Sequence, residues 1–512
     1  MLRPTPLPSL ARAALAGLLA GGAALGISEL LAGLIVGAPS LVVSIGDGVI
    51  ALQPPGAKQV VVGLLGEADK LALVLFVVAV ALAAAAGLGV LARTRPQLAA
   101  AGYVAFGLLA FVASLRDPQV EPILGVLVAG TAVATALIAL RWLLRAAAPH
   151  SSSAQMPDWA RRRFIGTSLA VAGVAVTSGT LGRILLQQGR TSARGASTVR
   201  VPLPSATPLP DAASLDVAGI TPIVMPNRDF YRIDTALLVP RPEVDTWRLN
   251  VSGMVDTAFE LTYADLAAMP QQAQYVTIAC VSNEVGDHLV GNALWSGVRL
   301  RDLLDRAGVQ EGATQIVGRA VDGWTAGFPT AWVTENPREA LVALSMNGEP
   351  LPPDHGFPAR LIVPGLYGYV SATKWLAQIQ LTTLEAFDAY WIPLGWAKLG
   401  PILTQSRIDT PRSGATVEAG TIPVAGVAWA PDRGISRVEV QVDGAGWTDA
   451  ELSEAISDAT WVQWVHRWQA TPGRHQIEVR ATDGTGETQT AERTPPAPDG
   501  ARGHHTITVN VS

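Results

Sequence analysis

The sequence predicts a helical membrane-spanning region, then an α+β domain, then an all-β sandwich. Positions 1–190 are rich in Ala, Leu, Val and Gly, carry few charges and contain one histidine, His150. Residues 227–404 mix short β-like runs with brief helical ones, and 405–512 hold alternating strands separated by Asp-Gly and Pro-Gly turns. The net charge of −5 over 512 residues gives no reason to expect a nucleic-acid partner.

Five apolar runs in the first 190 residues predict membrane-spanning helices. Four are long enough to cross a bilayer, which takes about 20 residues: 14–37, 70–92, 97–115 and 122–144. A fifth, less apolar run spans 164–186. Core helices of a soluble protein are the alternative, but several runs with so few polar residues argue against it.

Arginine placement predicts the orientation of these spans. Arginines gather in the segments on one side of the membrane: Arg3, Arg12, Arg93, Arg95, Arg141, Arg145 and Arg161–Arg163. The short loops on the other side carry only Lys58, Lys70 and Arg116. The positive-inside rule puts the first side in the cytoplasm. We therefore expect a multi-pass protein of the cell membrane with its catalytic part, after residue 190, outside the cytoplasm.

Smaller features of the first 226 residues carry further expectations. The segment Arg161–Ile165 resembles a twin-arginine export signal, here internal, with a plain positive-inside flank as the alternative. The loop 38–69, with the alternating stretch Leu41–Ile45, is expected along the outer interface. Glu29 should face another helix or be protonated, because a charged acid at the bilayer centre costs about 2.5–3.5 kcal/mol. Residues 191–226 form a linker with too few large apolar side chains to bury it.

The α+β domain can be divided into elements by pattern and turn signals. Strands are expected at Trp247–Ser252, Gln274–Ile278 and Ala359–Val363, and helices at Thr262–Ala268 and Leu300–Arg306. The order lacks the regular βαβ alternation of a dinucleotide-binding domain.

Cys280 is the only cysteine in the chain and lies just past the strand 274–278. A lone thiol cannot form an intrachain disulfide, an iron–sulfur cluster or a cysteine-rich zinc site, because each needs several thiolates. Three interpretations remain: a buried structural cysteine, a nucleophile, or a single thiolate ligand to a metal otherwise held by a cofactor.

Two cations lie in unusual surroundings. Arg360 ends the stretch His355–Arg360, and Lys374 ends the stretch Gly368–Lys374 ahead of a tryptophan. Both adjoin apolar strands, where a cation needs an anionic partner. A phosphate-bearing cofactor would supply one.

The segment around Cys280 is followed by the stretches His355–Arg360 and Gly368–Lys374. In this order, the three segments resemble the molybdopterin domain of the sulfite oxidase family. The resemblance implies that Cys280 is the thiolate ligand of a molybdenum held by the dithiolene of one molybdopterin. It implies a set of residues around the pterin and its phosphate: Asn227, Phe230, Tyr231, Asp322, His355, Arg360, Ala372, Thr373 and Lys374. The resemblance also matches Tyr390 to a tyrosine near the metal, with an aromatic core or surface residue as the alternative. The implied reaction is two-electron oxygen-atom transfer on a small sulfur- or nitrogen-containing substrate.

The sequence departs from the sulfite-oxidising members at two positions. Those members carry an arginine in the segment that matches residues 227–235, which we call the early segment, at the position of Ile233 in this chain. They carry another soon after the residue that matches Asn283, where this chain has Glu284. Losing two cations, one to an acid, disfavours a sulfite dianion. Arg232 or Arg228 could compensate, and a neutral S-oxide or N-oxide is the alternative substrate.

The C-terminal sandwich resembles the immunoglobulin-like dimerisation domain of the same family, which makes a homodimer one expectation. Strands are expected at Val438–Val442, Gln476–Arg480 and Thr506–Val511. Four tryptophans are expected in a core or interface: Trp447, Trp461, Trp464 and Trp468. His504 and His505 are expected on a solvated strand edge, with metal chelation as the alternative.

No Cys-x-x-Cys-His motif is present and the spans lack histidine, so no haem is expected. No iron–sulfur cluster is expected either, because the chain has a single cysteine. Electrons should therefore pass to or from a separate cytochrome or quinone-linked protein. The membrane region resembles the anchors of actinobacterial relatives. The alternative function is an exported binding module that kept the fold and lost the metal, but keeping both the thiol and the cations argues against it.

Overall fold

The computed structural model describes residues 9–54, 68–148, 158–188, 208–335 and 339–512. These residues form two compact units. The first holds the helices before residue 195, and the second holds nearly all of the chain after it.

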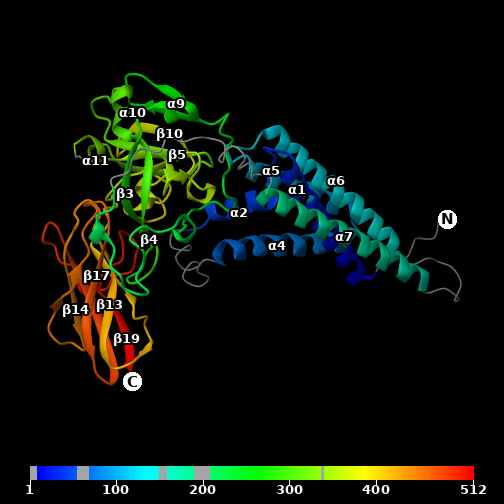
Figure 1. Ribbon diagram of the computed structural model, residues 1–512. Helices are drawn as coiled ribbons and strands as arrows, with labels where there is room; N and C mark the ends of the chain where they lie inside the picture. The colour runs from blue at the N-terminus through cyan, green and yellow to red at the C-terminus, as the bar shows by residue number, and fades with distance from the viewer. Residues whose placement is uncertain (1–8, 55–67, 149–157, 189–207, 336–338) are drawn as a thin grey trace, which may run out of the picture. The chain divides into compact units, whose positions relative to one another are not determined.

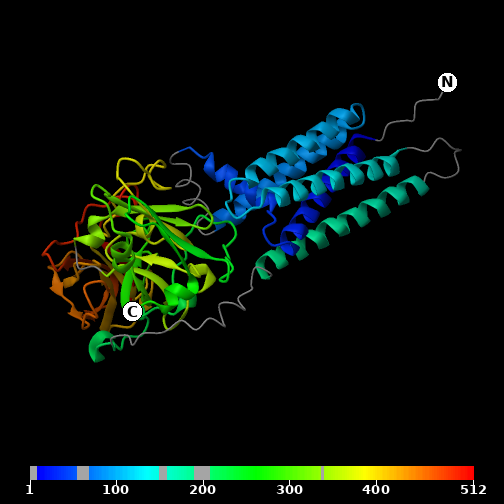
Figure 2. The same cartoon turned by 90° about the horizontal axis from the view of Figure 1, so that it is seen from above.

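The first unit is a bundle of helices that pack side by side (Figures 1 and 2). Five of its described helices are long and apolar enough to cross a membrane, as expected. They are α1 (Leu10–Leu34), α4 (Asp69–Leu91), α5 (Pro96–Ser114), α6 (Pro122–Ala147) and α7 (Asp158–Gln188). Helix α1 packs against α4, α6 and α7.

Small residues let α1 approach its neighbours closely. A Cβ on Gly182 of α7 would clash with the main chain of Glu29 in α1, and one on Gly26 would clash with Ala175. Gly17 meets Gly89 of α4 in the same way. Close backbone approach at small residues is typical of packed membrane helices.

Glu29 faces a neighbouring helix, which was one of its two expected arrangements. Its side chain is nearly buried, and its carboxylate lies 3.2 Å from Arg183 NH1 of α7. Ser40 Oγ donates to the other carboxylate oxygen at 2.6 Å.

The stretch Leu41–Ile45 is helical, so the expectation of a loop there was wrong for part of 38–69. Helix α2 spans Leu41–Ala51, and the Ser40 hydroxyl caps its N-terminus by accepting from Val43 N at 3.3 Å. Five alternating residues are too few to separate a strand from a helix. Residues 55–67 lie outside the described ranges.

The α+β domain contains two mixed or antiparallel sheets. One has the strand order β2-β1-β10-β5-β6, with β1 and β10 parallel; the other has β3-β4-β7-β8, with β9 paired to β7. The strands are β1 (Arg248–Gly253), β2 (Phe259–Thr262), β3 (Gln272–Ala279), β4 (Val290–Arg299), β5 (Gln315–Ala320), β6 (Thr325–Pro329), β7 (Leu341–Met346), β8 (Glu349–Pro350), β9 (Arg360–Ile362) and β10 (Leu376–Thr382).

Short helices connect these strands where the sequence signals them. They are η3 (Asn227–Asp229), α9 (Tyr263–Ala268), α10 (Leu300–Ala307), α11 (Ala331–Thr334), η4 (Pro353–His355) and α12 (Gly368–Ser371). Thr262 and Asp265 form a capping box on α9. Helix α10 stops at Gly308, whose φ of 67° closes the C-terminus.

The C-terminal domain is a sandwich of two sheets, with strand orders β11-β13-β17-β16 and β12-β19-β18-β14-β15. Its strands are β11 (Gln405–Thr410), β12 (Thr416–Val417), β13 (Gly420–Trp429), β14 (Ile435–Val442), β15 (Thr448–Asp449), β16 (Glu451–Leu452), β17 (Val462–Ala470), β18 (Gly473–Asp483) and β19 (His505–Val511). Trp464 and Trp468 lie in its core, whereas Trp461 joins the core of the α+β domain. Trp447 is half-buried, with the Arg480 guanidinium over its ring.

The structure describes two segments that were expected at the surface. In the described part of the linker, 208–226, Ala213 and Ile223 are buried, and Leu215 N donates to Gln463 Oε1 at 2.6 Å. His504 is not on a solvated edge: it is buried and bonded to Glu478 and to Gln489 O. Long-range polar contacts, which composition does not reveal, join the linker to the sandwich and enclose His504.

Candidate active site

Cys280 lies at the tip of the β3–β4 hairpin, in the loop 280–289 that we call the cysteine loop. Its thiol is half-buried and its Sγ lies 2.9 Å from Ser282 Oγ. Cys280 N donates to Leu289 O at 2.9 Å, and Leu289 N donates to Asn283 Oδ1 at 2.7 Å. These bonds close the loop at its base, so the thiol has a defined place at the end of a buried strand.

A cluster of three basic side chains, His355, Arg360 and Lys374, is buried nearby in the sheet formed by β7 and β9 and in the turns beside it. His355 Nε2 lies 2.8 Å from Asn227 O, and Arg360 NH1 donates to His355 O at 3.3 Å. Lys374 Nζ donates to Asp354 O at 3.1 Å and pairs with Asp234. We call these three residues the cation cluster.

Burial lowers the pKa of all three side chains of the cation cluster. It lowers the pKa of His355 to about 4, helped by the charge of Arg360, so this imidazole is neutral at pH 7. It also lowers the pKa of Arg360 to about 10. For Lys374, burial lowers the pKa to about 8, although Asp234 acts in the opposite direction.

The cation cluster lacks enough anions of its own. Among the described residues, Arg360 Nε and Thr373 Oγ1 are buried without a hydrogen-bond partner, and no carboxylate forms an ion pair with Arg360. Its guanidinium lies instead over the Trp295 ring, 5.3 Å from the centroid. Buried donors of this kind need an acceptor. An anionic, phosphate-bearing group fits them.

Aromatic residues of the early segment pack against the cation cluster. The Phe230 ring stacks on Tyr231 at 5.2 Å and meets His355 edge-on at 5.7 Å. Burial raises the pKa of Tyr231, as does the nearby charge of Cys280. Tyr231 therefore keeps its hydroxyl proton beside the thiol.

Helix α12 brings the motif Ser-Ala-Thr-Lys to the same place. A Cβ on Gly368, its first residue, would lie 3.8 Å from Ala279 O and 3.9 Å from the Tyr231 hydroxyl. Ala372 and Thr373 follow the helix and are buried. The structure thus gathers Asn227, Phe230, Tyr231, His355, Arg360, Ala372, Thr373 and Lys374 around one region next to the cysteine strand.

Two expected site residues have contacts that do not decide their roles. Asp322 Oδ1 accepts from Trp324 N at 3.1 Å within the β5–β6 turn. Tyr390 N donates to Thr325 Oγ1 at 3.0 Å, and its ring meets Trp391 edge-on at 5.0 Å. Both assignments stay predictions.

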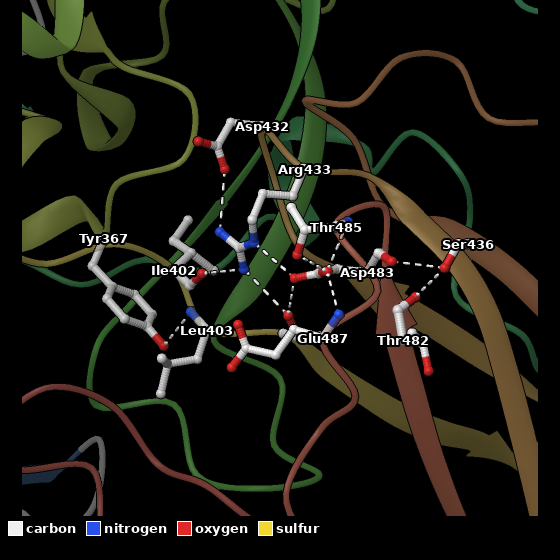
Figure 3. A network of polar contacts seen from close by, with 11 residues as sticks. Tyr367, Ile402, Leu403, Asp432, Arg433, Ser436, Thr482, Asp483, Thr485 and Glu487 are labelled. Atoms are coloured by element: carbon white, nitrogen blue, oxygen red, sulfur yellow. Dashed lines mark hydrogen bonds and ion pairs between the residues drawn. The ribbon is translucent and has the colours of Figure 1, made fainter.

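The sequence reasoning missed three residues of this region: Asp234, Ser282 and Tyr367. Burial raises the pKa of Tyr367, and the charge of Cys280 adds to the rise. Its hydroxyl accepts from Leu403 N at 3.4 Å, next to a polar network around Arg433 and Asp483 (Figure 3). Tyr367 directly precedes the Gly368 motif, which is the one signal that marks it in the sequence.

Both arginines of the early segment pair with carboxylates, so neither replaces the two missing cations. Arg232 pairs with Asp234 and Asp354, each at 3.2 Å. Arg228 pairs with Asp229, and its side chain is 85% exposed. Ile233 is exposed, as is Glu284 in the cysteine loop.

Comparisons with known proteins agree with this arrangement. The profile of the oxidoreductase molybdopterin binding domain matches residues 236–391, and that of the bacterial Ig domain matches 405–479. The uncharacterized oxidoreductase YuiH of Bacillus subtilis is 37% identical over 159 residues, which cover 31% of this chain and 76% of YuiH. The chain belongs to the sulfite oxidase family of molybdopterin-binding oxidoreductases.

Two further relatives are matched over a smaller share of their own length. Mitochondrial sulfite oxidase of Rattus norvegicus is 30% identical over 271 residues, covering 45% of this chain and 49% of that enzyme. Nitrate reductase [NADH] 1 of Oryza sativa is 33% identical over 178 residues, covering 30% and 19%. The chain thus spans about half the length of the sulfite oxidases it matches. Its molybdopterin-binding domain implies a molybdenum cofactor.

Proposed function

We propose that the chain is a membrane-anchored molybdenum–molybdopterin oxidoreductase. It would transfer an oxygen atom, with two electrons, to or from a small sulfur- or nitrogen-containing substrate outside the cytoplasm. The observation that carries the proposal is the cation cluster with its unpaired Arg360 Nε, buried in the domain whose sheet also holds the strand that presents Cys280.

Each residue has a role that follows from its contacts. Cys280 would ligate the metal, since metal coordination deprotonates a thiol. Arg360 and Lys374 would bind the phosphate, and Thr373 Oγ1 would donate to it. Neutral His355, whose Nε2–H donates to Asn227 O, would accept a hydrogen bond at the pterin edge through Nδ1 without adding charge. The bound cofactor supplies the two-electron exchange of an oxygen atom.

The charges near the cysteine loop favour a neutral substrate. Glu284 stands in the cysteine loop, and Arg232 is already paired with two carboxylates. A sulfite dianion would therefore meet too little positive charge, whereas a neutral S-oxide or N-oxide needs none. We propose reduction of such an oxide as the reaction.

The remaining assignments rest on sequence patterns. Positive-inside flanks support a catalytic domain outside the cytoplasm, and the immunoglobulin-like domain supports a homodimer. A separate cytochrome or quinone-linked protein would exchange the electrons.

Metal analysis tests the proposal first. Protein produced with molybdate should contain molybdenum, and protein produced without it should not; molybdenum absent from both would leave a binding module without catalysis. Loaded protein is then assayed for sulfite oxidation and for reduction of methionine sulfoxide and small N-oxides. Efficient turnover of sulfite would overturn the argument from charge.

A further inference from the structure

We propose that Arg407 and His505, both in the C-terminal sandwich, are positioning residues that hold the cysteine loop in shape. The proposal rests on the proposed function, because it treats the thiol of that loop as the group whose place matters.

Arg407 bonds the cysteine loop directly. It lies on β11, is 8% exposed, and its NH1 donates to Asp287 O at 2.9 Å. Its Nε pairs with Asp409 at 2.6 Å, and its NH2 donates to Thr221 Oγ1 at 2.8 Å. Since all three guanidinium nitrogens are bonded, the side chain is held in one position and connects the sandwich to the loop.

His505 supports the loop one residue earlier. Its Nδ1 accepts from Ile408 N at 2.9 Å, which fixes the ring. Gly286 lies against this ring with φ of +87°, and a Cβ there would clash with the imidazole. Only glycine fits at 286, both for its backbone angle and for its contact with His505.

The strand before the thiol is tied to the same domain. Thr277 N donates to Ala459 O at 2.9 Å, and Trp461 N donates to Thr277 Oγ1 at 2.8 Å. The sandwich therefore bonds the chain on both sides of Cys280, at Thr277 and at Asp287. A metal ligand has to be held within about 0.5 Å of its productive place. The sandwich adds this support to the hydrogen bonds within the loop, which include those from Asn283 N to Cys280 O and from Asp287 N to Glu284 O.

The test uses the fact that Cys280 is the only thiol in the chain. Full-length protein is produced without molybdate, and its rate of alkylation by iodoacetamide is measured at one pH. We expect Arg407→Gln to be alkylated at least fivefold faster than the wild type. The control is Arg480→Gln, which removes an arginine of the same sandwich that pairs with Glu439 and lies over Trp447. It should react at the wild-type rate.

A second readout uses molybdenum-loaded protein. Arg407→Gln should keep its molybdenum content but show a shifted or broadened Mo(V) resonance, whereas Arg480→Gln should not. Wild-type alkylation rate and wild-type resonance in Arg407→Gln would overturn the proposal. If Arg407→Gln does not fold, Gly286→Ala replaces it, since it displaces the loop from His505 without removing any polar side chain.

The outcomes separate this proposal from the proposed function. Loading with molybdenum should protect the wild-type thiol from alkylation; failure to protect it counts against the metal-ligand role. The comparison of metal-free variants does not depend on that result, because it reads only how firmly the sandwich holds the loop.

Discussion

Lys374 and Asp234 form an ion pair at 2.8 Å in which the side chains are only 8% and 4% exposed. Asp234 neutralises the charge of Lys374, and no carboxylate of the described residues forms an ion pair with Arg360. A buried charge without a partner is costly. The cofactor-free site therefore favours the binding of an anion. The protonation state of Lys374 changes near pH 8.

Cofactor affinity should depend on pH through Lys374. Burial lowers the pKa of Lys374 to about 8, so the empty site holds a neutral amine above pH 8. A bound phosphate stabilises the charged form, so binding takes up a proton there. Affinity for molybdopterin should be flat from pH 6 to 8 and fall up to tenfold per pH unit above 8. Binding to metal-free protein measures it; Lys374→Arg should stay flat to pH 9, and a flat wild-type profile would contradict the assignment.

Glu284→Arg should shift substrate preference toward anions. The added positive charge in the cysteine loop attracts sulfite but not a neutral sulfoxide. We expect KM for sulfite to fall at least threefold and KM for methionine sulfoxide to change less than twofold. Steady-state assays measure both, with Glu311→Arg, an exposed position elsewhere in the domain, as the control. Equal effects from the two variants would show that position 284 is not near the substrate.

Asp483→Asn should weaken the sandwich and remove part of its acid sensitivity. Burial acts to raise the pKa of Asp483, but hydrogen bonds from Thr485, Arg433 and Thr404 overcome it and hold the pKa at about 2. A carboxyl depressed in the folded state stabilises above its unfolded pKa near 4, and that contribution is lost as pH falls toward 2. At pH 7 the substitution should lower the free energy of unfolding by about 2 kcal/mol.

Chemical unfolding of the detergent-solubilised chain, followed by tryptophan fluorescence, measures this difference. The gap between wild type and Asp483→Asn should close between pH 4 and 2. Asp449→Asn, which removes an exposed ion pair with Arg437, should cost under about 1 kcal/mol at either pH. A pH-independent gap for Asp483→Asn would refute the assignment.

Gly182→Leu should separate α1 from α7. Position 182 touches the main chain of Glu29, and a larger side chain there also pulls Arg183 away from its partner. Because a leucine there overlaps the main chain of α1, the melting temperature in detergent should drop by several degrees. Gly173→Leu on the same helix meets nothing within 4 Å and should melt like the wild type. Equal melting of both variants would contradict the packing.

The sequence predicts most of the framework, because run length and turn residues act locally. The five spans, the capped helix at Thr262 and the strand before Cys280 depend on neighbours in the chain. Helix α2 was missed because Leu41–Ile45 alternates too briefly to exclude a helix. Asp234, Tyr367 and Arg407 were missed because their significance comes from contacts with Lys374, the thiol and Asp287, which only the folded chain brings together.

The most direct test of the account is X-ray absorption at the molybdenum edge of the wild type and Cys280→Ser. If Cys280 ligates a pterin-held molybdenum, the serine variant should show one sulfur neighbour fewer and lose at least 100-fold in turnover. An unchanged sulfur shell with unchanged turnover would contradict the account.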